Sequence, residues 1–132
     1  IVDVIFARWQ AHVVRIPLRN VAPDASGLRD WRSRQQPVFV FPEGRAKVAF
    51  GGIRRGAGRW LATLDMPVVP VGVWWTRDSG WHVCFGAPLV WTHRDDLRDV
   101  QLGLAMAALL PDALALDWQA DLARWRAAHE TP

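Results

Sequence analysis

Two short apolar runs constrain the fold more than any other feature of the sequence. Residues 38–41 and 68–74 each have the length and the continuous apolar character of a buried strand. Between them, residues 53–64 place apolar side chains on one face of a helix. A strand, a helix and a second strand in this order are typical of an α/β fold.

Shorter signals extend this order toward both ends. Residues 13–18 predict another strand, and Asp24 or Ser26 could cap a short helix that ends near Gln35. A turn signal at residues 77–80 predicts that residues 81–90 return as an antiparallel edge strand. Residues 94–129 predict one or two helices, interrupted near Pro111. We therefore expect an α/β fold with a mixed, largely parallel sheet flanked by helices, and a helical C-terminal tail.

The length of 132 residues fits a single domain, and an apolar fraction of 51% is sufficient for a core. The first residues read like the middle of an element, so we expect residues 1–132 to form one domain truncated before Ile1. Cys84 is the only cysteine, which excludes an intrachain disulfide. No apolar run reaches the roughly 18 residues that a membrane-spanning helix needs.

Two features of the composition are unusual: the basic residues are nearly all arginine, and tryptophan is abundant. The formal net charge is only +3, but 15 of the 16 basic residues are arginine, which suits bidentate phosphate recognition. The chain has nine tryptophans and no tyrosine. Tryptophan is both a normal core residue and a residue of membrane interfaces, so both interpretations stay open.

A loop with candidate binding residues follows the first apolar run. Phe41, Pro42, Glu43 and Gly44 lie at the end of a predicted strand, where open α/β sheets place their ligand sites. Proline removes a backbone donor from the sheet, and glycine lets a ligand approach the backbone closely. The Glu43 carboxylate could orient an arginine or accept a hydrogen bond from a substrate hydroxyl. Clustered basic residues, which favour phosphate binding, follow at Arg45, Lys47, Arg54, Arg55 and Arg59.

The order of these segments resembles the glycerolphosphate (lysophospholipid) acyltransferase family. The sequence Phe41-Pro42-Glu43-Gly44 is similar to the third sequence block of that family, and residues 67–71 (Pro-Val-Val-Pro-Val) are similar to its last block. The Gly56-Ala57 step resembles a small-residue pair on the helix between those blocks, and residues 13–20 resemble the second block. The resemblance covers residues 13–91.

This resemblance implies an acyltransferase of phospholipid biosynthesis or remodelling. The donor would be an acyl thioester (acyl-CoA or acyl carrier protein), and the acceptor a lysophospholipid or glycerol phosphate hydroxyl. It implies no cofactor and a peripheral location on the cytoplasmic face of the membrane, with the membrane surface as a partner. Residues 68–71 would support the cleft. The match assigns substrate binding to Arg19, Phe41, Pro42, Glu43, Gly44 and Arg45.

The catalytic pair of the family is not found in this sequence. Members use a histidine as general base, with an aspartate five residues later that orients it. The residues at that spacing from the first three histidines are Pro17, Ala87 and Arg98, and His129 lies too near the last residue. By the resemblance, the pair is expected upstream of Ile1. The third block also departs from its usual threonine, arginine and serine, because Arg45, Ala46 and Lys47 follow its glycine.

Other functions stay open. A non-catalytic remnant of the family would bind lipid or phosphate without turnover, and nucleic-acid binding is disfavoured by the small net charge and the lack of a known motif. The C-terminal tail could pack on the sheet or lie on a membrane surface. Two local predictions concern side chains: His82 should be exposed in the hairpin, and Thr92 should cap a helix with Asp95 and Asp96 in its first turn.

Overall fold

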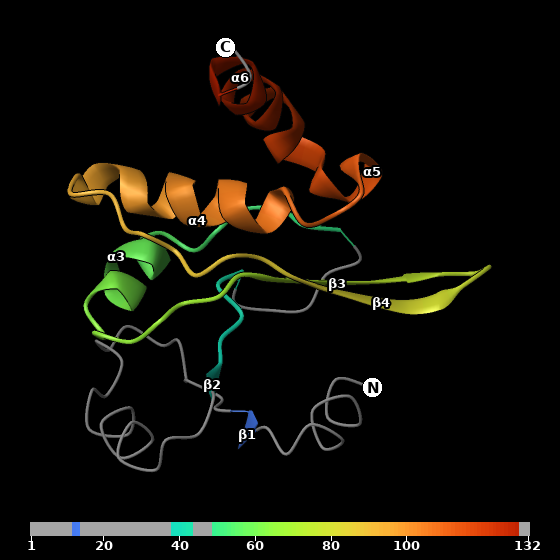
Figure 1. Ribbon diagram of the computed structural model, residues 1–132, viewed down its shortest axis with the longest axis horizontal. Coiled ribbons are helices and arrows are strands. Elements are labelled where there is room, and N and C mark those ends of the chain that lie inside the picture. The colour runs from blue at the N-terminus through green and yellow to red at the C-terminus, as the bar shows by residue number, and fades with distance from the viewer. Residues whose placement is uncertain (1–11, 14–37, 44–48, 130–132) are drawn as a thin grey trace. The chain divides into compact units, whose positions relative to one another are not determined.

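The computed structural model describes residues 12–13, 38–43 and 49–129. The chain divides into two units, residues 1–41 and 42–132, and each is described by itself. In the first unit, β1 (His12–Val13) and β2 (Val38–Phe39) form a short parallel pair. The second unit consists of a hairpin and a set of helices (Figure 1).

The hairpin consists of β3 (Val71–Thr76) and β4 (Gly80–Phe85), which pair antiparallel. Residues 77–79 form the predicted turn, and Gly80 closes it at a φ of 76°, which glycine adopts more easily than other residues. Two backbone bonds extend the pairing beyond the strands: Gly86 N–H donates to Pro70 at 2.9 Å, and Leu89 N–H to Val68 at 2.8 Å. The predicted turn and antiparallel return are therefore confirmed.

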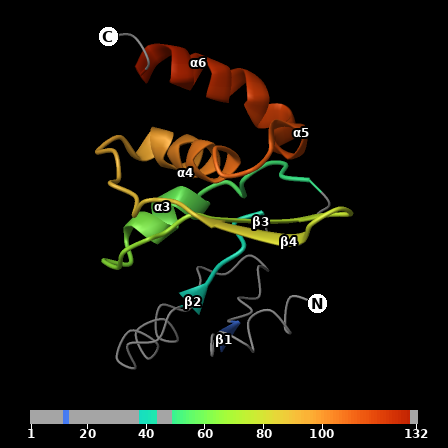
Figure 2. The ribbon, with the colours of Figure 1, turned by 45° about the vertical axis from the view of Figure 1, so that its right-hand side comes forward.

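The other regular elements in the described part of the second unit are helices. Figures 1 and 2 both show α4 between the hairpin and α6, with α3 on the hairpin side of α4. The predicted helical tail and its interruption at Pro111 are confirmed. None of the helices in the described ranges is both long and apolar enough to cross a membrane. The helices are α3 (Ala57–Ala62), η1 (Asp95–Leu97), α4 (Arg98–Ala107), α5 (Asp112–Ala115), η2 (Leu116–Trp118) and α6 (Gln119–His129).

The core of the second unit lies where these helices meet the segment before α3. Its buried members are Phe50, Ala107, Ala115 and Leu122, which are at most 3% exposed. Partly buried side chains surround them, including Trp118. A single aromatic ring from outside the helices thus packs against side chains from α4, α5 and α6.

The predicted sheet is wrong. In the described part of the chain, parallel pairing is limited to His12 with Val38 and Val13 with Phe39, and the larger strand pair is an antiparallel hairpin. Residues 68–74 were expected to be a buried strand of a largely parallel sheet, but β3 pairs with the strand that follows it. Pairing through a short turn closes a small loop, which costs less chain entropy than a crossover connection.

Local boundaries also differ from the predictions. The helix expected at residues 53–64 is shorter, because Gly56 has a left-handed conformation (φ 87°) and α3 begins only at Ala57. The helix expected to end near Gln35, and most of the strand expected at residues 13–18, lie outside the described residues.

Candidate functional site

Pro42 and Glu43 form a turn that is fastened to the segment leading into α3. Pro42 is buried, and its carbonyl accepts the Arg54 N–H at 2.8 Å. Glu43 is half-buried, and its Oε2 accepts the Gly51 N–H at 3.2 Å. Because a backbone donor engages the carboxylate, the Glu43 side chain is held in one direction rather than left to rotate in solvent.

The segment that receives this turn, residues 50–54, is here called the strap. Phe50 at its start is 3% exposed, and its N–H donates to the Leu114 carbonyl at 2.9 Å. The Phe50 ring stacks on Trp118 at a centroid distance of 5.9 Å, and Trp118 Nε1–H donates to the Gly51 carbonyl at 2.6 Å. Gly51 therefore links Glu43 on one side to Trp118 of the helical core on the other.

Three exposed arginines follow the turn along the strap and α3: Arg54, Arg55 and Arg59. Arg54 is joined to the Pro42 turn through its backbone N–H, so the cationic segment begins where the Glu43 turn is attached. Guanidinium groups present forked donors that match phosphate oxygens. The turn thus provides a hydrogen-bonded carboxylate, and the chain that follows it provides three solvent-accessible arginines.

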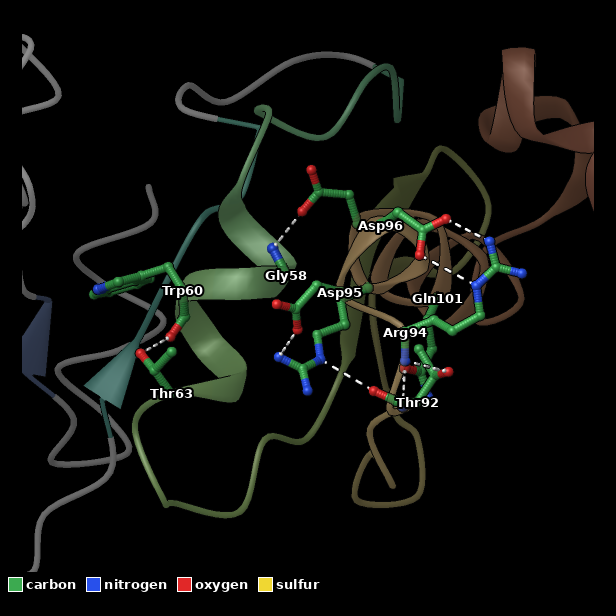
Figure 3. Close-up of polar contacts among 10 residues, drawn as sticks. Gly58, Trp60, Thr63, Thr92, Arg94, Asp95, Asp96 and Gln101 are labelled. Atoms are coloured by element: carbon green, nitrogen blue, oxygen red, sulfur yellow. Dashed lines mark hydrogen bonds and ion pairs between the residues drawn. The ribbon is translucent and has the colours of Figure 1, made fainter.

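The start of α3 is closed by an aspartate from α4. Asp99 Oδ2 accepts the Gly56 N–H and Oδ1 accepts the Gly58 N–H, both at 2.7 Å. The bond to Gly58 is drawn in Figure 3. A Cβ on Gly58 would collide with the Arg98 carbonyl and lie 2.8 Å from the Asp99 nitrogen, so α3 and α4 meet backbone to backbone. The positive end of the α3 dipole is thus already matched by a carboxylate, and phosphate binding here would depend on arginine side chains.

The residues before α4 form a second polar cluster, shown in Figure 3. Arg94 donates to Asp96 through Nε at 3.2 Å and NH2 at 2.6 Å, and the hydrogen bond from Arg94 holds the pKa of Asp96 below its usual range. Asp95 and Asp96 do lie in the first turn of η1, as predicted. Thr92 as a helix cap is wrong: the residue before η1 is Arg94, and Thr92 Oγ1 accepts only the Arg94 N–H at 3.3 Å.

Comparison of the chain with protein-family models, with curated proteins and with solved structures found no match. No family is shown. The acyltransferase resemblance of the sequence blocks therefore stays a prediction.

Of the six predicted binding residues, Phe41, Pro42 and Glu43 are described, while Arg19, Gly44 and Arg45 lie outside the described residues. Phe41 is 44% exposed and Pro42 is buried. Of the second and third sequence blocks, the structure describes only Val13 and residues 41–43.

The prediction that His82 is exposed is wrong. His82 is half-buried, because its ring stacks on Trp74 at 5.1 Å and its Nε2 lies 2.7 Å from Ser79 Oγ and 3.1 Å from Thr76 Oγ1. Its hydrogen-bond partners are therefore hydroxyl groups of the hairpin end. Across the described ranges, no three His, Cys, Asp or Glu side chains gather closely enough to hold a metal ion.

Sequence reasoning missed Asp99 and Trp118, which organise the site from a distance. Asp99 lies 43 residues from Gly56, and Trp118 lies 67 residues from Gly51. One signal for Asp99 was present: the helix after Gly56 has no Ser, Thr, Asp or Asn at its start, so its first N–H groups needed an acceptor from elsewhere.

Proposed function

We propose that this chain carries the acceptor-binding segment of an acyltransferase that acts on lysophospholipids or glycerol phosphate. The acyl group would come from an acyl thioester, either acyl-CoA or acyl carrier protein. In this proposal Glu43 orients a basic residue or the acceptor hydroxyl. Arg45 and Arg19 bind the acceptor phosphate, and Phe41, Pro42 and Gly44, from the same block as Arg45, contribute to substrate binding.

The observation that carries the proposal is the anchored Glu43 turn. A Phe-Pro-Glu-Gly segment in an ordinary surface turn has no need to fix its carboxylate, yet Glu43 accepts a backbone N–H from the strap. The strap is itself held by Phe50 and Trp118 in the core. The exposed arginines that follow supply the charge that a phosphate would need. These features support an anchored Glu43 turn followed by exposed arginines that a phosphate could bind.

A second candidate function is lipid or phosphate binding without turnover. It is favoured by one observation, the absence from the sequence of a histidine with an aspartate five residues later. In that case a lysophosphatidate would bind through the same residues, and no acyl transfer would follow.

The test is an acyl-transfer assay on the natural gene product with acyl-CoA and lysophosphatidate, paired with a binding measurement by calorimetry. Arg45→Ala should raise the KM for the acceptor at least about tenfold more than the KM for the donor, since a charged hydrogen bond is worth about 1.5–3 kcal/mol and about 1.4 kcal/mol corresponds to a factor of ten. Arg124→Ala is the matched control, because Arg124 is an exposed arginine on α6. Equal acceptor KM values for the two variants would remove Arg45 from the site.

Glu43 offers a finer comparison. Glu43→Gln keeps an oxygen that can accept the Gly51 N–H, so the turn should survive while the negative charge is lost. Glu43→Ala loses both. If the charge orients the acceptor site, Glu43→Gln already impairs the acceptor KM at unchanged stability. Binding without any transfer in the unmutated gene product would establish the second function instead.

A further inference from the structure

We propose that one face of the β3–β4 hairpin docks on an anionic lipid surface. The antiparallel register places Val73 opposite Val83 and Trp75 opposite Trp81. All four side chains are exposed, at 40% for Val73, 43% for Val83, 56% for Trp75 and 51% for Trp81. Side chains two residues apart on a strand point to the same face, so these pairs form one apolar surface, here called the hairpin face.

The hairpin face continues away from the turn without a charged residue. Val71 pairs with Phe85 in the next position of the same face, and Phe85 is 54% exposed. Val69, which is 41% exposed, extends the row by one further position. From Val69 to Trp75 the row spans about 20 Å at the usual strand rise. An exposed apolar surface of this length that contains no charged residue marks an interaction site.

The opposite face of the hairpin is the one packed inside the protein. A Cβ on Gly72 would lie 3.0 Å from the Leu109 Cβ and 3.2 Å from the Leu109 carbonyl oxygen. Figures 1 and 2 show α4 along this side and α6 beyond it. The hairpin face therefore points away from the helices of its own unit.

The composition of the hairpin face favours lipid over a protein partner. Tryptophan is enriched at the membrane interface, and Trp75 and Trp81 form a cross-strand pair beside the turn. Arg77 in that turn is exposed, and a basic side chain next to interfacial tryptophans can reach anionic headgroups.

The net charges of two described parts of the second unit support the same conclusion. Residues 53–93, which include α3 and the hairpin, carry four arginines and two aspartates, a net charge of +2. Residues 94–127, which form the helices on the other side, carry four arginines and six aspartates, a net charge of −2. An anionic surface would attract the part of the chain that contains the hairpin and repel the part that contains the later helices, which favours an approach by the hairpin. The inference deepens the proposed function and rests on it only for the source of the lipid acceptor.

The test is flotation of the full chain with vesicles of phosphatidylcholine and phosphatidylglycerol that contain neither acyl donor nor lysophospholipid. The double variant Trp75→Ser/Trp81→Ser should reduce the bound fraction at least about tenfold, because roughly half of each ring surface is available for burial in the interface. Trp125→Ser is the matched control, because Trp125 is 45% exposed but lies on α6. It should bind like the unmutated chain.

A charge variant keeps the proposal testable if the double variant does not fold by circular dichroism. Arg77→Glu leaves the hairpin face intact and should weaken binding to phosphatidylglycerol vesicles while leaving binding to pure phosphatidylcholine unchanged. Equal flotation of the double variant and Trp125→Ser would overturn the proposal. So would a dimer of the unmutated chain that becomes monomeric in the double variant with flotation unchanged, since the face would then join two copies. Acceptor kinetics of Arg45→Ala report on the proposed function separately, because flotation requires no acyl transfer.

Discussion

Replacement of Asp99 by alanine tests whether α3 depends on a carboxylate supplied by α4. The change removes the acceptors of two 2.7 Å bonds, from Gly56 N–H and Gly58 N–H. Gly58 is buried, so its N–H would lose its partner out of reach of water, whereas Gly56 is only half-buried and can be solvated. An unsatisfied buried donor costs about 1–3 kcal/mol, and loss of a helix cap about 0.5–2 kcal/mol.

These two terms overlap, because both describe the same lost bonds. We therefore expect Asp99→Ala to lower the free energy of unfolding by about 2 kcal/mol, which for a chain of this size lowers the Tm by about 8 °C. Asp99→Asn keeps one oxygen and should cost about half as much, with that oxygen on the Gly58 N–H. The assay is urea denaturation followed by circular dichroism, since a change of midpoint at constant slope reports stability.

Asp96→Ala is the control, because Asp96 is an exposed aspartate of the same region whose ion pair with Arg94 lies in solvent. Its midpoint should stay close to that of the unmutated chain. A midpoint for Asp99→Ala equal to that of Asp96→Ala would refute the reasoning, and so would Asp99→Asn being as damaging as Asp99→Ala.

Further stability predictions concern the contact between α3 and α4 and the packing of the strap against the helices. Gly58→Ala should lower stability by about 1–3 kcal/mol, against the usual gain from alanine in a helix, because its Cβ would overlap the α4 backbone. Gly52→Ala, where a Cβ meets nothing within 4 Å, is the control, and an equal midpoint for both would contradict the close approach. Trp118→Phe should cost about 1 kcal/mol, because stacking is kept while the Gly51 carbonyl loses its donor. Phe50→Ala should cost about 3–5 kcal/mol, and a loss below that of Trp118→Phe would contradict its place in the core.

Turns and helix breaks could be predicted from the sequence, but the partner of each strand and the face that it buries could not. The turn at residues 77–80 and the break at Pro111 follow from single-residue backbone preferences, which act regardless of the rest of the fold. The continuous apolar run at residues 68–74 was interpreted as a strand buried on both faces. The structure instead leaves Val69 and Val73 exposed on one face, and apolar content alone does not distinguish the two cases.

The long-range contacts that support the Glu43 turn could not be predicted from the sequence, for a different reason. Glu43 was selected from its local sequence, and local sequence is sufficient to place a carboxylate in a turn. The contacts that hold the strap beneath this turn come from Leu114 and Trp118, whose spacing from residues 50–51 follows only from the packing of the helices. Sequence patterns report which residues belong to a helix face, and they do not report which distant backbone group that face will meet.

The sequence left two interpretations of the C-terminal tail, packing on the sheet or binding to a membrane surface. The structure gives the tail a further role, which is to hold the strap. Leu122 is 1% exposed and packs in the cluster around Phe50, so the tail uses apolar surface of α6 to hold the strap as well as to cover α4. Trp118 donates to the Gly51 carbonyl while the Gly51 N–H donates to Glu43, which makes one peptide segment the link between the tail and the carboxylate. The direction of the Glu43 side chain thus depends on helices more than 65 residues away, which are the parts of the chain with no counterpart in the sequence blocks that suggested a function.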